Sequence, residues 1–320
     1  MPDSFGEFMR LRSFMLCCSL LAIFSSSGPL AAETPRKKVL IIGTDGTRLD
    51  ALEKAKTPNI DRLIERGTLF RGTKILDPAR ATKPDTVSGP GWSNILTGVW
   101  PDKHGVMDNK FQGSQYEKFP HFFVRLKEGR PGARTASFSS WDPIHQRIVA
   151  GADVSKDSLP NDKGDWAEAD IESTKSCLEE LKSNDPTAVV LYLGQVDETG
   201  HAHGFHPLVE KYIEAIERMD GHVGEVTAAL EARPTFKDEE WLVIVCTDHG
   251  GRATNHGGGH EYPEITETFL IVSGPSASRG MSTEPTNQVD VVATALTHLG
   301  VPMKPEWKLD GKPAGLKGPR

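Results

Sequence analysis

The stretch "KKVLIIGTDG" at residues 37–46 indicates the class of fold. Its apolar run, residues 39–42, is continuous rather than alternating, which is typical of a strand covered on both faces of a sheet. The run stops at "GTDG", the composition of a turn. Two later stretches repeat this arrangement, "TAVVLYLGQVD" at 187–197 and "WLVIVCTD" at 241–248. We therefore expect a buried, largely parallel sheet.

Helical patterns lie between these strands. "TPNIDRLIERG" at 57–67 places Ile60, Leu63 and Ile64 on one face, behind Thr57 as the expected cap. Further strands are predicted at 134–141 and 268–275, and further helices at 165–184, 207–233 and 287–300. The alternation predicts an α/β fold with a mostly parallel central sheet sandwiched by helices. Residues 142–164, rich in Asp, Gly and Pro, are expected to form a short insertion near the active site.

Length and composition are those of a soluble globular protein. The 320 residues carry 25% charged and 37% hydrophobic side chains and a net charge of −7, which argues against a nucleic-acid scaffold. The sequence contains no repeat and no low-complexity linker, so residues 33–320 are predicted to form a single domain.

Residues 1–32 have the pattern of a signal peptide. Two arginines precede an apolar run at 14–24, and small residues end in Leu-Ala-Ala. Met9 is an alternative start, and an uncleaved anchor is the alternative to cleavage. Export to the periplasm or the medium is therefore expected, with no stable membrane span after cleavage. Only Cys177 and Cys246 remain in the mature chain, so no disulfide framework is predicted.

A serine is presented at a turn in "TVSGPGWSNILTG", residues 86–98. Ser88 precedes Gly-Pro-Gly, and a helix is expected from near Trp92 to Gly98. The start of a helix offers free N–H groups that suit an anion or a nucleophile. Taken alone, the same stretch also fits an ordinary surface turn.

Acidic residues and histidines follow each of the three strongest strands. Asp45 follows the first strand, Asp197 and His201 follow the second, and Asp248 and His249 follow the third. Ligands bind at the carboxyl ends of strands in sheets of this kind, and buried carboxylates need partners. Mixed Asp and His ligation suits zinc and related transition ions. Because Asp248 and His249 are adjacent and point different ways, two neighbouring ions are predicted.

A further histidine ligand is expected from the glycine-rich loop "RATNHGGGHEYPE", residues 252–264. His256 and His260 are the two candidates. A flexible turn with solvent-exposed histidines is the alternative for this loop. The remaining histidines considered are predicted to be structural or exposed: His104, His203, His206 and His222.

Together these motifs resemble the alkaline phosphatase superfamily, in particular its nucleotide pyrophosphatase/phosphodiesterase branch. The resemblance rests on "IIGTDGTR" (41–48), "SGPGWSNILTGVWPDKHGV" (88–106), "VDETGH" (196–201), "TDHGG" (247–251) and "HGG" (256–258). It extends from about residue 38 to 300 and implies an alkaline-phosphatase-like fold.

The resemblance also implies roles for particular residues. Ser88 takes the place of the nucleophile, which is more often threonine in this branch, and Asn109 that of the amide contacting the phosphoryl oxygens. His256, thirteen residues before Phe269, has the spacing of the family's last ligand, with His260 as the fallback. Two zinc ions are implied, or other divalent transition metals, one held by Asp45, Ser88, Asp248 and His249 and one by Asp197, His201 and His256.

The implied reaction is hydrolysis of a small-molecule phosphate ester through a phosphoseryl intermediate, most plausibly of a diester. A phosphomonoesterase or phosphonate hydrolase is the alternative, and a monoesterase needs an additional cation, for which Lys110 and Arg252 are candidates. A sulfatase is disfavoured because Trp92 stands where the sulfatase motif has arginine. Trp92 is interpreted either as a stacking platform for a nucleobase or as core packing. A metal- or phosphate-binding protein without catalysis is the non-enzymatic alternative.

Overall fold

The computed structural model describes residues 35–159 and 163–318. The predicted signal peptide, residues 1–32, lies outside these described residues. Within the two described ranges, no helix is both long and apolar enough to cross a membrane.

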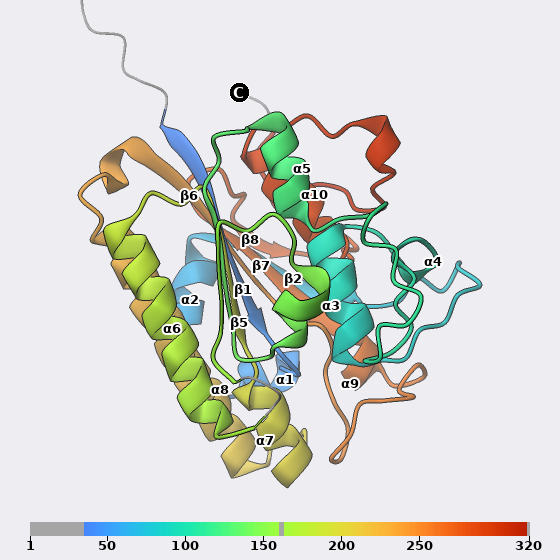
Figure 1. Ribbon diagram of the computed structural model, residues 1–320. Helices are drawn as coiled ribbons and strands as arrows, with labels where there is room; N and C mark the ends of the chain where they lie inside the picture. The colour runs from blue at the N-terminus through green and yellow to red at the C-terminus, as the bar shows by residue number, and fades with distance from the viewer. Residues whose placement is uncertain (1–34, 160–162, 319–320) are drawn as a thin grey trace, which may run out of the picture. The chain divides into compact units, whose positions relative to one another are not determined.

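An eight-stranded sheet runs through the centre of the molecule in the order β4-β3-β5-β1-β6-β7-β2-β8 (Figure 1). The strands are β1 (Arg36–Thr44), β2 (Gly67–Lys74), β3 (Thr135–Ser139), β4 (Val154–Asp157), β5 (Ala188–Leu193), β6 (Glu239–Cys246), β7 (Glu267–Ser273) and β8 (Gly280–Ser282). Neighbours from β4 to β6 are parallel, and β7 is antiparallel to both β6 and β2. The prediction of a mostly parallel sheet is confirmed.

Helices cover both faces of this sheet, so that α3, α5 and α10 lie on one side and α2, α6 and α8 on the other (Figure 1). The α-helices are α1 (Leu49–Leu52), α2 (Pro58–Glu65), α3 (Ser88–Thr97), α4 (Pro101–His104), α5 (Phe122–Gly129), α6 (Trp166–Ser183), α7 (Gln195–His203), α8 (Glu210–Glu231), α9 (Pro263–Thr266) and α10 (Asp290–His298). A π-helix, η1 (Ile144–Ile148), and two short 3-10 helices, η3 (Phe236–Asp238) and η4 (Pro305–Trp307), complete the described elements.

The continuous apolar run of β1 supplies both cores. Val39 and Ile41 belong to the core beneath α3, α5 and α10, whereas Leu40 and Ile42 belong to the core beneath α2, α6 and α8. Side chains alternate across a strand, so a strand covered on both faces must be apolar at every position. Cys177 and Cys246 are both buried and free, as expected for a chain without a disulfide framework.

Two segments differ from the prediction. Part of the expected insertion at 142–164 is β4, an edge strand of the sheet paired with β3. Its sequence, "VSKD", is polar because the residues of an exposed edge need not be apolar. β2, "GTLFRGTK", was not expected, since its apolar residues form only a short run.

Two helix starts also differ. α3 begins at Ser88 rather than near Trp92, and it ends before Gly98 as predicted. Pro90 is the third residue of this helix, in the first turn, where its missing N–H costs no helical hydrogen bond. Thr57 does precede α2, but its side chain makes no capping bond, and Asp220 of α8 accepts from the N–H groups of Asn59 and Ile60 instead.

Gly43 of β1 leaves room for the indole of Trp92. A Cβ atom at residue 43 would lie 2.3 Å from the Trp92 ring. We expect Gly43→Ala to lower the free energy of unfolding by about 1–3 kcal/mol or more, because overpacking a dense core forces side chains and backbone to shift. Urea unfolding measures the loss.

Gly221, exposed within α8, is the matched control for this substitution. An added Cβ there would meet no atom within 4 Å. Gly221→Ala should stabilise the protein by roughly 0.5–1 kcal/mol, because alanine is the better helix former and restricts the unfolded chain. Equal effects at the two positions would contradict the packing argument.

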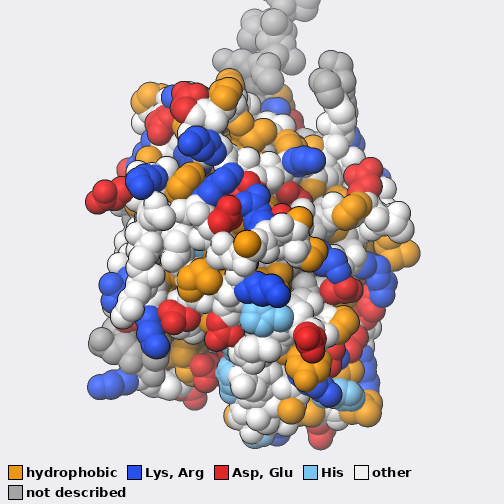
Figure 2. Space-filling view, turned by 90° about the vertical axis from the view of Figure 1, so that its right-hand side faces the viewer, with side chains coloured by type: hydrophobic (Ala, Val, Ile, Leu, Met, Phe, Trp, Pro, Cys, Tyr) orange, Lys and Arg blue, Asp and Glu red, His pale blue; other side chains and the backbone are white. Residues whose placement is uncertain are grey.

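Positive and negative side chains are interspersed on the surface shown in Figure 2. Lysines, arginines and carboxylates alternate there over short distances, and apolar side chains are scattered between them. This face therefore lacks the continuous basic stripe with which proteins bind the phosphates of nucleic acids.

Candidate metal centre

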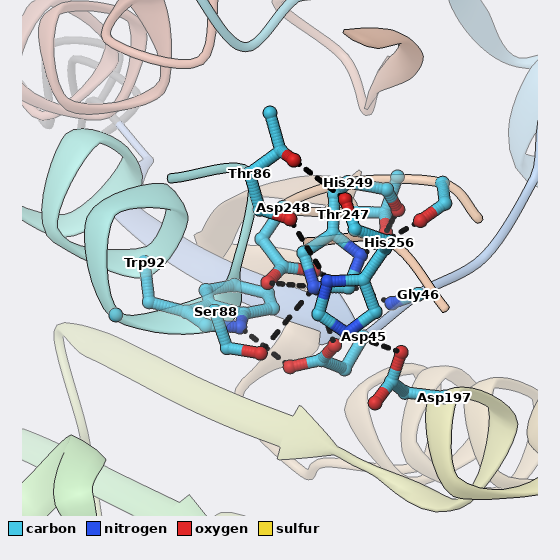
Figure 3. Close-up of polar contacts among 12 residues, drawn as sticks. Asp45, Gly46, Thr86, Ser88, Trp92, Asp197, Thr247, Asp248, His249 and His256 are labelled. Carbon is cyan, nitrogen blue, oxygen red and sulfur yellow. Dashed lines mark hydrogen bonds and ion pairs between the residues drawn. The ribbon is translucent and has the colours of Figure 1, made fainter. Parts of the chain in front are cut away.

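The three central strands bring three aspartates together at one end of the sheet. β5, β1 and β6 are immediate neighbours, and Thr44 pairs with Leu193 while Gly43 pairs with Cys246. This register brings the residues that follow each strand alongside one another. Asp45, Asp197 and Asp248 thus converge with His249 and His256 around one point (Figure 3).

Gly46 makes this convergence possible. Its φ of +63° is in the left-handed region, and a Cβ at this position would lie 2.3 Å from Oδ1 of Asp197. Its N–H donates to Oδ1 of Asp248 at 3.3 Å. The glycine after the first strand therefore allows the backbone to turn between two of the three carboxylates.

A first group of candidate ligands surrounds Nε2 of His249. This nitrogen lies 3.2 Å from Oδ2 of Asp248, 3.6 Å from Oδ1 of Asp45 and 3.4 Å from Oγ of Ser88. Nδ1 of the same ring lies 2.9 Å from the carbonyl oxygen of Gly250, which can only accept, so Nδ1 carries the proton. Nε2 is consequently the ring nitrogen that faces the two carboxylates and the serine.

A second group consists of Asp197, His201 and His256. Nε2 of His201 lies 3.3 Å from Oδ2 of Asp197, and Nε2 of His256 lies 3.6 Å from its Oδ1. The two Nε2 atoms are 3.0 Å apart, and each ring turns its Nδ1 to a backbone carbonyl, of Thr254 and Thr86. Two lone pairs this close repel unless a proton or cation lies between them. Asp197 and His201 lie one turn apart on α7, the helix that directly follows β5.

The two groups adjoin. The rings of His249 and His256 stack with centroids 3.7 Å apart at an angle of 21°. The two groups thus lie side by side. Asp248 and His249 do not point different ways as expected, because Oδ2 of Asp248 and Nε2 of His249 converge in the first group, 3.2 Å apart.

Unpartnered oxygens show that this cluster suits cations. Among the described residues, Oδ1 of Asp45, Oδ1 of Asp197 and Oδ2 of Asp248 are buried and accept no hydrogen bond. The three residues are 1%, 8% and 0% exposed. Buried carboxylate oxygens without partners are costly, and a divalent cation satisfies several of them at once. Carboxylate oxygens with imidazole nitrogens form a donor set that zinc and related transition ions accept.

The electrostatics of the cluster agree with this. Burial raises the pKa of Asp45, and the charge of Asp197 raises it further. Burial also raises the pKa of Asp248, with Asp45 and Asp197 adding to the effect. The hydrogen bond to Asp197 raises the pKa of His201 to about 9. Asp45 and Asp248 thus resist ionising beside Asp197, whose own pKa is lowered, against the effect of burial, by its hydrogen bond to His201. A bound cation would relieve the repulsion at Asp45 and Asp248.

Burial has the opposite effect on the other histidine of the second group. It lowers the pKa of His256 to about 3, so this imidazole is neutral at physiological pH. Neutral imidazole is the form that binds a metal ion.

Ser88 and Asn109 lie at the start of α3. Ser88 is the first residue of the helix and is 7% exposed, with Oγ directed at the first group (Figure 3). Oδ1 of Asn109 accepts from the N–H of Gly89 at 2.6 Å. That bond fixes the amide so that its NH₂ group is the part available to an anion beside Ser88.

Other predicted candidates lie elsewhere. His260 contacts the carbonyl oxygen of Pro84 through Nε2 at 2.7 Å, so the geometry favours His256 as the loop ligand. Lys110 is 75% exposed and pairs with Asp108 at 3.9 Å. Arg252 pairs with Glu264 at 3.2 Å and lies over the ring of Tyr262.

His104 is structural, as predicted. Its ring is buried, with Nε2 3.0 Å from Oδ1 of Asn94 and Nδ1 accepting from the N–H of Val106. Asn94 in turn donates to Gln288, whose side-chain amide bonds the carbonyls of Thr247 and Asp248. This chain of buried amides ties α3 to the end of β6.

Two aromatic residues of the site have roles that the sequence did not reveal. Trp92 is 1% exposed and therefore packs in the core, where it cannot stack on a nucleobase, and its Nε1 donates to Oδ2 of Asp45 at 2.8 Å. The hydroxyl of Tyr192, the last but one residue of β5, donates to the same oxygen at 2.5 Å. Neither contact has a sequence signal, because both depend on which elements are neighbours.

A serine, a histidine and an aspartate also lie together elsewhere in the fold, but they do not form an active site. Ser137, His145 and Asp157 are linked in series, with His145 Nε2 2.8 Å from Oγ of Ser137 and Nδ1 against Asp157. Ser137 is fully buried in β3, so no substrate reaches its hydroxyl. These bonds join β3, η1 and β4.

Comparisons with known proteins agree with this geometry. A family model described as type I phosphodiesterase / nucleotide pyrophosphatase matches residues 39–297. Human ectonucleotide pyrophosphatase/phosphodiesterase family member 7 is 24% identical over 298 residues, covering 84% of this chain and 62% of that protein. The chain thus spans less than two thirds of the length of this curated relative.

Solved structures share the fold. An inactive variant of murine ectonucleotide pyrophosphatase/phosphodiesterase 5, in complex with AMP, gives a TM-score of 0.65 at 15% identity, covering 83% of this chain and 96% of that one. A 2-O GAG sulfatase gives a TM-score of 0.69 at 16% identity, covering 88% of this chain and 73% of that one. The match of the family model spans most of the sequence, and the chain therefore belongs to the type I phosphodiesterase / nucleotide pyrophosphatase family of the alkaline phosphatase superfamily.

Proposed function

We propose that this protein is an exported di-zinc hydrolase of small phosphate esters, a phosphodiesterase that acts through Ser88. The observation that carries the proposal is the position of the Ser88 hydroxyl, at a helix start and 3.4 Å from Nε2 of His249. The ligand assignments follow the two groups described above: Asp45, Ser88, Asp248 and His249 for one ion, and Asp197, His201 and His256 for the other. Bound zinc would supply positive charge for the serine oxygen and for the anionic ester.

The residues of the chain position the reacting atoms. Oγ of Ser88 attacks phosphorus, the bond from phosphorus to the leaving oxygen breaks, and the hydroxyl proton passes to the departing alcohol or to solvent. Water then hydrolyses the phosphoseryl linkage and restores the serine. The first turn of α3 holds Ser88 at the positive end of the helix dipole, which favours the anionic substrate there.

Asn109 is proposed to donate its NH₂ group to a phosphoryl oxygen. Asn109→Asp keeps an acceptor for the N–H of Gly89 but replaces the donor with a negative oxygen. We expect kcat to fall roughly 10²–10³-fold, the usual effect of losing one such donor. Steady-state kinetics on an activated diester measure this. Lys110→Ala, on the exposed neighbour, is the control and should keep the wild-type rate, whereas an unchanged kcat in Asn109→Asp would remove Asn109 from the mechanism.

The charges around the site favour a diester over a monoester. A monoester carries an additional negative charge, and hydrolases of monoesters bind it with a further cation. Both candidate cations, Lys110 and Arg252, pair with carboxylates outside the two ligand groups. The AMP complex of the murine structure makes phosphodiesters that contain an AMP moiety the first class to test.

Export and domain organisation are part of the same proposal. Residues 1–32 have the pattern of a signal peptide, and the human relative is named an ectonucleotide enzyme. Residues 33–320 would then act as a single catalytic domain in the periplasm or the medium. N-terminal sequencing of the exported protein tests this, with Glu33 as the expected first residue.

A paired rate assay tests the activity. Purified protein with zinc is offered bis-p-nitrophenyl phosphate, p-nitrophenyl phosphate and p-nitrophenyl sulfate, and metal content is measured on the same sample. We expect the diester to be hydrolysed fastest. Preference for the monoester would establish the phosphomonoesterase alternative, and preference for the sulfate the sulfatase alternative. Two bound zinc ions with no turnover of any of the three would favour a phosphonate hydrolase or a binding protein.

A further inference from the structure

Asp45 is held differently from the other two aspartates of the centre. Its Oδ2 accepts from Nε1 of Trp92 at 2.8 Å and from the hydroxyl of Tyr192 at 2.5 Å. By contrast, Oδ1 of Asp248 accepts from the backbone N–H of Gly46. Asp197 meets the imidazoles of its own group. Of the three carboxylates, Asp45 is thus the one oriented by two neutral side-chain donors.

These donors give the two carboxylate oxygens of Asp45 different surroundings. Oδ2 is saturated by the indole and the phenol, whereas Oδ1 accepts no hydrogen bond within the described chain and lies 3.6 Å from Nε2 of His249 (Figure 3). Rotation of the carboxylate would break both donor bonds and leave a buried N–H and a buried O–H without partners. Such groups are costly to leave unpaired, so the orientation is strongly preferred.

Packing fixes the donors themselves. The rings of Trp92 and Tyr192 meet edge to face, with centroids 5.1 Å apart at 70°, and Trp141 stacks beside Tyr192 at 6.1 Å. Trp92 also fills the space above Gly43, and both donor residues are at most 3% exposed. Neither ring can turn away from Asp45 without opening the core.

The two donors come from two elements that lie against β1. Tyr192 is in β5, one of the two strands hydrogen-bonded to β1, and Trp92 is in α3, one turn beyond Ser88. The Trp92 bond therefore connects the helix of the proposed nucleophile directly to a candidate metal ligand.

We propose that Trp92 and Tyr192 are positioning residues that select Oδ1 of Asp45 as the ligand atom and so set the zinc affinity of the first group. This inference rests on the proposed metal centre and goes beyond it in assigning a role to two residues that touch neither metal nor substrate. Partners that orient metal-ligating side chains typically change metal affinity 10–100-fold when they are removed.

Tyr192→Phe is the sharper of two test variants, because it removes only a hydroxyl. Trp92→Phe removes the N–H but also leaves a space in the core. Zinc dissociation constants are measured on the full chain by competition with a chelator. This measurement resolves the more tightly bound ion from the less tightly bound one. We expect each variant to raise one of the two constants about 10–100-fold and to leave the other unchanged, since both donor bonds go to Asp45 of the first group.

Matched controls separate positioning from stability. Tyr116→Phe removes a phenol hydroxyl that lies 2.6 Å from Oγ of Ser93. Ser93 is in α3, the helix of Trp92. Trp241→Phe removes an indole N–H bonded to a carboxylate, Glu239, at 2.7 Å at the other end of β6. Both controls should lose stability comparable to the test variants, as measured by Tm, and keep both zinc constants.

The possible outcomes distinguish a failure of this inference from a failure of the proposed function on which it rests. A wild-type protein that binds no zinc would overturn the metal centre itself. A wild type with two ions and test variants with unchanged constants would overturn the positioning role alone. Equal weakening of both ions, or equal weakening in Trp241→Phe, would show that Trp92 and Tyr192 act only on stability and would also overturn it.

Discussion

Ser88→Ala is expected to abolish turnover of a phosphodiester while leaving the fold and the zinc content intact. Removing the nucleophile of a hydrolase that forms a covalent intermediate costs about 10⁴–10⁶ in kcat. The hydroxyl contributes little to stability, since its one described side-chain contact is with His249 at 3.4 Å. The six other proposed ligands stay in place: Asp45, Asp197, His201, Asp248, His249 and His256.

The measurement combines kcat on bis-p-nitrophenyl phosphate with zinc content and Tm on the same sample. Ser93→Ala is the matched control, because Ser93 lies on the same helix, is fully buried and bonds to the carbonyl of Gly89 rather than to the centre. It should lose some stability but keep most of its activity. A Ser88→Ala protein that turns over at the wild-type rate would eliminate the serine mechanism, and the loss of both zinc ions would show that Ser88 is needed to build the site.

Ser88→Thr provides a further check on the same mechanism. Threonine keeps the hydroxyl, and the related branch of the superfamily more often has threonine at the corresponding position. We expect the variant to retain measurable turnover where alanine does not. Inactivity of both variants with normal zinc content would mean that the geometry at residue 88, rather than its hydroxyl alone, limits the reaction.

The sequence predicts those parts of this site that depend on local order along the chain. Asp45, Asp197 and Asp248 each follow a continuous apolar strand, and parallel strands bring their carboxyl ends to one edge of a sheet. That argument required no knowledge of which strands are neighbours. The structure adds that β5, β1 and β6 are adjacent, which brings the three carboxylates within reach of common ions.

The parts that the sequence does not predict depend on spatial neighbours. Tyr192 looks like any aromatic residue of a buried strand, and its hydroxyl has meaning only because β5 lies beside β1. Trp92 has the pattern of core packing, and its N–H is assigned only once α3 is seen to cross over Gly43. β4 is too polar to be recognised, because an edge strand buries little of its surface.

Asp197→Ala is expected to reduce bound zinc from two equivalents towards one. Asp197 contributes both carboxylate oxygens to the second group, at 3.3 Å from Nε2 of His201 and 3.6 Å from Nε2 of His256. Without it, two neutral imidazoles remain, fewer than the three protein ligands typical of a catalytic zinc site. Turnover should fall with the metal, because a bound ion would supply positive charge for the anionic ester.

Metal analysis after gel filtration measures the stoichiometry, and Asp220→Ala is the matched control. Asp220 is also a buried aspartate, but its carboxylate accepts from the N–H groups of Asn59 and Ile60 at the start of α2. That variant should lose stability and keep two zinc ions. Two equivalents of bound zinc in the Asp197→Ala variant would show that Asp197 is not a metal ligand.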